Sequence, residues 1–215
     1  MIRNIVIERE YGSGAGGIAK KIADRLGWKL WDHAITEEIA RRLHCDVKAV
    51  EEHEERCDSA LYRLMKAFMR GSYEDRMVGG GHVELLDSDR LAEIFEQIAL
   101  DIAKQGNAVI VGRGATWFLR DREDTFTVFI FAPREEKLRR LLASHKTVAE
   151  AEELIERVDQ ERAAFIKHYY GRNWPQRDLY HLMINSKVGD DLVVQTILTE
   201  IDLLNQREKM RSGAA

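Results

Sequence analysis

A cluster of glycines follows the first apolar segment of the chain. It lies between the β-branched run Ile5-Val6-Ile7 and a stretch whose apolar residues recur at helical spacing. Glycines let a loop approach an anion closely because they have no Cβ, and a helix N-terminus offers unpaired N–H groups and a positive dipole end. The sequence therefore predicts a phosphate cradle, made of Tyr11, Gly12, Ser13, Gly14, Ala15, Gly16 and Gly17. The alternative is a tight turn whose glycines only let the helix pack on the strand.

The cradle lacks the cation that usually accompanies it. In the phosphate-binding Walker pattern G-x-x-x-x-G-K-[ST], Ala15 occupies the Lys position, Gly16 the Ser/Thr position, and Arg9 the first Gly position. The usual point charge for the β- and γ-phosphates and the usual Mg²⁺ hydroxyl are both missing. We expect Arg9 to replace the charge, because a guanidinium can clamp phosphate bidentately. The alternative is that Arg9 pairs with a carboxylate, such as those of its two sequence neighbours.

Five apolar segments alternate with helical patterns along the chain. The expected strands are 5–7, 29–31, 108–111, 126–131 and 181–185, with helices near 135–144 and 147–169 and at the C-terminal end. This order predicts an α/β fold with three layers: a parallel sheet of about five strands, right-handed crossovers, and helices on both faces. Ligands in such sheets bind at the carboxyl ends of the strands.

Several segments together resemble the cytidylate kinase-like family. The opening Glu8-Arg9-Glu10-Tyr11-Gly12-Ser13-Gly14 matches best, followed by Ile18-Ala19-Lys20-Lys21. Trp31-Asp32, Val111-Gly112-Arg113, Tyr169-Tyr170-Gly171 to Trp174, and Ile184-Asn185-Ser186 agree with it. The resemblance covers most of the chain and is weakest over 59–88. That family also lacks the Walker lysine, and it often has Arg-Glu where this chain has Gly16-Gly17.

The resemblance implies a single P-loop kinase domain over about 1–210. A helical insertion at about 36–105 would bind the nucleoside monophosphate, a lid at about 140–175 would close the site, and 211–215 would be a disordered tail. The implied reaction is ATP plus CMP or dCMP giving ADP and the diphosphate, with Mg²⁺ accompanying ATP. Because the acceptor phosphate is already anionic, such a transfer needs positioning and charge neutralisation rather than a general base.

Arginines at strand ends and on the lid are the expected catalytic groups. Arg139 and Arg140, then Arg157 and Arg162, flank the lid and resemble the arginines that close over the transferring phosphate. We select Arg9, Arg139, Arg157 and Arg162. The alternative for the lid arginines is a solvated helix face.

Three further residues are expected to touch the acceptor or the metal. Arg113 resembles the position that binds the acceptor phosphate, with a structural ion pair as the alternative. Asp159 would orient a lid arginine or contact the acceptor. Asp32 would hold Mg²⁺ through water or bind the acceptor ribose, with a helix cap as the alternative, and Ser13 is the remaining local candidate near the metal.

Composition narrows the class of protein. The chain has 33 basic and 37 acidic residues and a net charge of -4, which argues against a nucleic-acid binder held by phosphate contacts. Two cysteines, no signal-peptide pattern and no long apolar run predict a cytoplasmic protein without a membrane partner.

A homodimer through the C-terminal helix or the insertion remains open. Two rival functions also remain open: a kinase of another small acceptor, with Asp32 as base, and a non-catalytic nucleotide-binding regulator.

Overall fold

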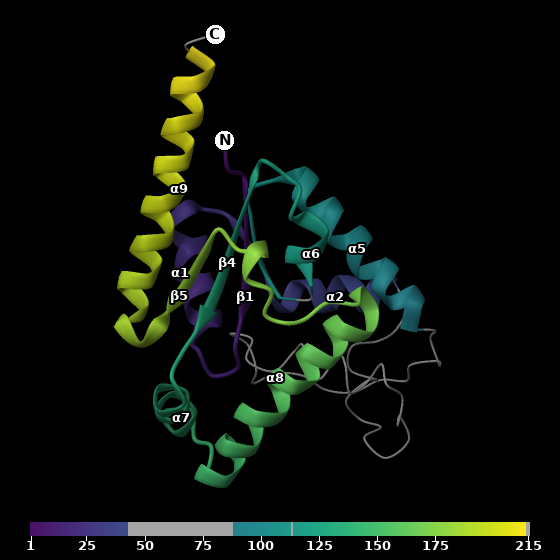
Figure 1. Ribbon diagram of the computed structural model, residues 1–215, viewed down its shortest axis with the longest axis vertical. Helices are drawn as coiled ribbons and strands as arrows, with labels where there is room; N and C mark the ends of the chain where they lie inside the picture. Colours follow the sequence, from purple (N-terminus) through teal and green to yellow (C-terminus); the bar gives the residue numbers. More distant parts are fainter. Residues whose placement is uncertain (43–87, 113, 214–215) are drawn as a thin grey trace.

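A five-stranded, all-parallel sheet forms the centre of the fold (Figure 1). The computed structural model describes residues 1–42, 88–112 and 114–213. The strand order is β2-β3-β1-β4-β5. The strands are β1 (Asn4–Arg9), β2 (Lys29–Trp31), β3 (Ala108–Val111), β4 (Thr125–Phe131) and β5 (Leu182–Asn185). All six residues of β1 are buried, since it pairs with β3 on one side and β4 on the other.

Two apolar layers cover the sheet, one on each face. Helices α1 (Ala15–Leu26) and α9 (Asp190–Gly213) pack on one face, where their isoleucines and valines meet alternate strand residues. On the other face lie α2 (His33–Arg42), α5 (Ser88–Gln105) and the short α6 (Ala115–Leu119). Side chains alternate between the two faces along each strand, so the continuous apolar runs of the strands serve both layers. The predicted three-layer α/β fold is confirmed.

Two helices lie beyond the carboxyl ends of the strands. They are α7 (Arg134–Ala143) and α8 (Val148–Tyr170), drawn in the lower part of Figure 1. Thr147 and Glu150 form a capping box that starts α8, and Gly171 ends it with φ 64°. A small apolar cluster joins the two helices to Tyr11 of the glycine loop. The region expected to be a lid is therefore packed against the predicted phosphate site.

The structure differs from the sequence-based expectations in a few elements. Helix α6 and the 3₁₀ turns 177–179 and 186–188 are not among the expected elements. Helix α9 continues through 211–213, where a disordered tail is expected. Of the expected insertion at 36–105, the structure describes the segments that belong to α2 and α5, and 43–87 lies outside the described residues. Within the described residues, no helix combines the length and the low charge that a membrane span requires.

The packing of α9 gives a test with a matched control on one helix. Ile197 is fully buried against the sheet, whereas Leu203 is 54% exposed. We expect Ile197→Ala to lower the free energy of unfolding by about 2–5 kcal/mol, and Leu203→Ala by less than about 0.5 kcal/mol. Urea unfolding followed by circular dichroism measures both. Equal losses would contradict the described packing of α9.

Candidate functional site

The segment between β1 and α1 forms a tight loop at the carboxyl end of the central strand. Gly12 and Gly14 have φ of 76° and 79°, a left-handed conformation that residues with a Cβ rarely adopt. Helix α1 begins at Ala15, and the Ile18 amide donates to the Gly14 carbonyl at 3.2 Å. The amides of 15–17 precede that bond and have no acceptor within the helix. The loop and the first turn of α1 thus have the geometry of an anion-binding helix N-terminus.

The loop itself supplies no cation to this cradle. Ala15, at the position of the Walker lysine, is 3% exposed and belongs to the apolar core between α1 and the sheet. The first turn of α1 contains no acidic residue that would repel an anion. Positive charge must therefore come from other elements.

Arg9, the last residue of β1, directs its guanidinium across the end of β3 toward β2. Its side chain is 4% exposed, and Nη2 lies 3.7 Å from Asp32 Oδ1. A Cβ on Gly112, after β3, would stand 2.5 Å from Nη1. The guanidinium therefore lies on the β3 side of β1, whereas α7 follows β4 on the other side. Pairing with a carboxylate, one of the two alternatives for Arg9, is the arrangement in the structure, with Asp32 as the partner.

The Arg9–Asp32 pair leaves hydrogen-bonding capacity unused. At 3.7 Å the contact is an ion pair rather than a hydrogen bond. Nη2 is buried and makes no hydrogen bond within the described part of the chain. Burying an unsatisfied donor costs free energy. An anion at the ends of β3 and β2 would accept a hydrogen bond from this guanidinium and remove that cost.

A second charged group ties the glycine loop to α7 and α8. Asp159 Oδ1 accepts the Tyr11 amide at 2.8 Å and Arg162 Nη1 at 3.1 Å. Arg162 Nη1 also donates to the Arg9 carbonyl at 3.0 Å. On the other side, Lys137 Nζ lies 2.8 Å from Glu10 Oε2 and 3.4 Å from Asp159 Oδ2. The pKa of Asp159 is raised, because burial outweighs the effect of Arg162 and the other donors around it.

Helix α7 carries a further arginine that touches the loop. Arg140 lies so close to Gly14 that a Cβ there would stand 2.1 Å from Nη1. Its Nε bonds Glu136 Oε1 at 2.8 Å, and its Nη2 bonds Asp190 Oδ1 at 2.7 Å and the Ser186 carbonyl at 3.3 Å. Arg140 is not among the lid arginines selected from the sequence. Helical spacing could have indicated that it lies on the loop-facing side of α7, because it follows Lys137 by three residues and precedes the buried Leu141 by one.

Arg139 and Arg157 lie apart from this cluster, with their side chains in solvent. Arg139 is 67% exposed and pairs with Glu136, one turn earlier on α7. Arg157 is 43% exposed and lies between Glu153 and Glu161 on α8. Arg113 lies outside the described residues. The structure therefore brings Arg9, Arg162, Asp32 and Asp159 to the sheet edge beside the loop.

Ser13 has the one aliphatic side-chain hydroxyl of the loop. It is 1% exposed, and its Oγ makes no hydrogen bond within the described residues. Its carbonyl accepts from Ser186 Oγ at 2.6 Å, which ties the loop to the turn after β5. In the described part of the chain, no group of three or more His, Cys, Asp or Glu residues could hold a metal by itself. An orphaned buried hydroxyl beside a phosphate cradle fits a metal that arrives with the phosphates.

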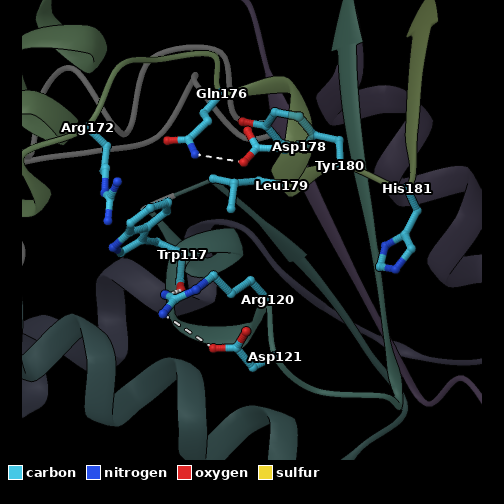
Figure 2. Close-up of a pocket in the computed structure, with 9 residues that line it drawn as sticks. All are labelled: Trp117, Arg120, Asp121, Arg172, Gln176, Asp178, Leu179, Tyr180 and His181. Atoms are coloured by element: carbon cyan, nitrogen blue, oxygen red, sulfur yellow. Dashed lines mark hydrogen bonds and ion pairs between the residues drawn. The ribbon is translucent and has the colours of Figure 1, made fainter.

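A separate polar pocket of about 420 Å³ lies between α6 and residues 172–181 (Figure 2). Two arginines face one indole in it: Arg120 lies 4.8 Å and Arg172 5.4 Å from the Trp117 ring. Asp121 and Asp178 also line it, so its charges balance, and none of its described lining residues belongs to the glycine loop. We therefore place the candidate site at the loop, where backbone donors and cations converge.

Comparisons with known proteins identify the family and the fold of the chain. The model of the cytidylate kinase-like family matches residues 4–188. A cytidylate kinase from Methanosarcina mazei is 30% identical over 122 residues, covering 52% of this chain and 68% of that protein. An uncharacterised protein from Eubacterium ventriosum has the same fold, with a TM-score of 0.65, 20% identity, and 94% and 99% of the two chains covered. A shikimate kinase from Bacteroides thetaiotaomicron follows with a TM-score of 0.53, 17% identity, and coverage of 94% and 99%.

Lys137 provides a test of the charged network behind the loop. Lys137→Met leaves Glu10 and Asp159 facing one another without their shared cation, so we expect a loss of about 3 kcal/mol in the free energy of unfolding. Lys20→Met is the matched control, because Lys20 pairs with Asp24 on the surface and should cost at most about 1 kcal/mol. Chemical denaturation at pH 7 measures both, and a Lys137 variant as stable as the Lys20 variant would contradict the network's role.

Glu136 makes the ion pairs of α7 dependent on pH. The hydrogen bond from Arg139 is the main reason that the pKa of Glu136 falls from 4.5 to about 2; burial opposes this shift and the bond from Arg140 adds to it. A lowered folded pKa stabilises the protein above the unfolded value and loses that effect as pH falls. We expect Glu136→Gln to cost about 1 kcal/mol or less at pH 7, with the difference shrinking between pH 4.5 and 2. Urea titrations across this range measure it, and a difference independent of pH would contradict the assignment.

Proposed function

The chain belongs to the cytidylate kinase-like family, and from that premise we propose that it transfers a phosphoryl group from Mg·ATP to a nucleoside monophosphate, preferably CMP or dCMP. Family and fold support a kinase. The choice of acceptor follows the family and the archaeal cytidylate kinase, since no described residue by itself selects cytosine.

One observation carries the proposal: an anion cradle at the carboxyl end of β1 is surrounded by cations from several elements. Arg9 comes from β1, Arg140 and Lys137 from α7, and Arg162 from α8. Phosphoryl transfer between phosphates needs in-line positioning and neutralisation of the charge on the transferring group. A backbone cradle with convergent guanidinium groups suits that task, and no side chain in the proposal has to remove a proton.

We assign the loop to the donor. Phosphate oxygens of ATP would accept hydrogen bonds from the amides of 15–17, and Ser13 Oγ would be the protein's own ligand to Mg²⁺. When bound, Mg²⁺ would neutralise part of the negative charge on the phosphates. Arg162, which donates to the Arg9 carbonyl and to Asp159, would hold the loop against α8 and place positive charge beside the transferring group.

We assign the ends of β3 and β2 to the acceptor. The Arg9 guanidinium lies there, paired with Asp32 and in contact with Gly112. In this proposal Arg9 and Arg113 bind the acceptor phosphate, and Asp32 holds Arg9 in place and reaches the ribose. Arg9 on the central strand would then lie between the acceptor phosphate, on the β3 side of β1, and the phosphates of ATP at the glycine loop. Asp159 acts through Arg162 and Tyr11, and Arg139 and Arg157 remain predictions of the family resemblance.

A panel of acceptors tests the proposal. Purified protein is incubated with Mg·ATP and each ribo- and deoxynucleoside monophosphate, and ADP formation is followed with an ATP-only control. We expect turnover confined to CMP, dCMP and, more slowly, UMP. We also expect Arg9→Ala to lower kcat/KM by about 100-fold or more, as removal of a charge-stabilising group does.

Two other outcomes would change the assignment. Turnover with a hydroxyl-bearing acceptor, together with a strong effect of Asp32→Asn on the chemical step, would identify a kinase of a different small molecule. Tight ATP binding with no turnover of any acceptor would contradict the kinase function and favour a regulatory nucleotide-binding protein.

A further inference from the structure

We propose that Arg140 takes the place of the missing Walker lysine, so that the phosphate-binding cation of the donor site comes from α7 instead of the glycine loop. This inference rests on the proposed function, because it concerns the same phosphate cradle. It assigns the donor-site charge to a residue outside the loop, about 125 positions further along the chain.

The contact with Gly14 is the first argument. A Cβ at Gly14 would stand 2.1 Å from Nη1 and 2.8 Å from Cζ of Arg140, closer than any real Cβ contact. The guanidinium therefore fills the space over the loop residue that immediately precedes the Lys position of the pattern. With φ of 79°, Gly14 is favoured by its backbone conformation as well.

The orientation of the guanidinium is the second argument. Its Nε and Nη2 are held by Glu136, Asp190 and the Ser186 carbonyl. Within the described residues Nη1 makes no hydrogen bond, and Nη1 is the nitrogen that lies against the loop. These three hydrogen bonds fix the guanidinium and leave the N–H groups of Nη1 directed at the cradle. Because the side chain is already ordered, less conformational entropy is lost when a phosphate binds.

Electrostatics supports a permanent cation at this position. Burial lowers the pKa of Arg140, but the bonds to Asp190 and Glu136 raise it more, and the net shift is upward. The neighbouring loop has no charged side chain at the Lys position of the pattern, where Ala15 lies. Arg140 is therefore a fixed positive charge touching a backbone cradle that has none of its own.

The Ser186 turn makes this arrangement rigid. Ser186 Oγ donates to the Ser13 carbonyl at 2.6 Å, and the Ser186 carbonyl accepts from Arg140. Ser186 is fully buried. The turn after β5 thus fixes the arginine and the loop relative to one another, as covalent attachment does for a lysine within the loop.

Binding of two phosphate probes tests the inference without requiring turnover. Isothermal titration with Mg·ATP and with Mg·tripolyphosphate compares wild type, Arg140→Gln and Arg134→Gln. Arg134 is the matched control, since it is on the same helix and pairs with Glu152 at the surface. We expect Arg140→Gln to weaken both probes by about 10- to 100-fold and Arg134→Gln to change neither by more than about twofold. Binding by Arg140→Gln within twofold of wild type would overturn the inference.

Arg140→Lys separates a phosphate-binding role from a structural one. It keeps a cation on α7 but cannot reproduce the three bonds to Glu136, Asp190 and the Ser186 carbonyl. We expect it to bind tripolyphosphate at least about tenfold more tightly than Arg140→Gln does. If Arg140→Lys binds no better than Arg140→Gln, Arg140 is only a brace and the inference fails.

A measurement on the wild-type protein keeps the test valid if Arg140→Gln does not fold. Phenylglyoxal modifies arginine side chains, and mass spectrometry locates the modified residues. Tripolyphosphate should slow the modification of Arg140 but not that of Arg134, which pairs with Glu152 at the surface. Equal modification of Arg140 with and without tripolyphosphate would overturn the inference. Wild-type protein that binds neither probe would overturn the proposed function and this inference together. ATP binding without turnover would overturn only the proposed function.

Discussion

The carboxylate of Asp159 is the contact on which the site depends most. One of its oxygens accepts from a loop amide and from Arg162, and the other faces Lys137. It thereby joins the loop, α7 and α8. Because an unpaired buried charge is expensive, each of these groups requires the others to be in place. The predicted lid helices are therefore packed against the predicted phosphate site in this structure.

A second constraint is steric. A side chain at Gly12 or Gly14 would be strained because both residues have positive φ. Helix α7 also lies directly against them: a Cβ at Gly12 would stand 3.1 Å from Lys137 Cβ, and one at Gly14 would displace the end of the Arg140 side chain. The glycines that suit an approaching phosphate also admit the helix that carries the cations. The conformation of the loop and the approach of the cationic side chains of α7 thus both depend on Gly12 and Gly14.

The sheet was predictable because its strands are continuous apolar runs separated by helical patterns, which only a buried parallel arrangement satisfies. The glycine cradle was predictable for a similar reason: its residues are adjacent in the sequence and their chemistry is local. The departure at Ala15 was equally visible. What the sequence could not provide was the identity of the nearby cations. Arg139 and Arg140 are neighbours with the same side chain, and only the rotation of α7 on the loop decides which one reaches Gly14.

The same limit applies to Arg9 and Asp32. Each could be singled out as a charged residue at a strand end, but their pairing depends on β3 lying between β1 and β2, an order that sequence periodicity does not determine. Arg157 shows the reverse case. It has the residue type and the approximate position expected of a lid arginine, yet its side chain points to solvent between two glutamates.

The turn after β5 extends this dependence to the end of the chain. Ser186 bonds to the loop near the N-terminus, and Asp190, which begins α9, holds Arg140. The surroundings of the glycine loop are therefore complete only after the last strand has joined the sheet, so a ribosome-bound chain or a C-terminally truncated one would have the loop without these contacts. Nucleotide would then bind only the fully assembled domain and stabilise it by mass action.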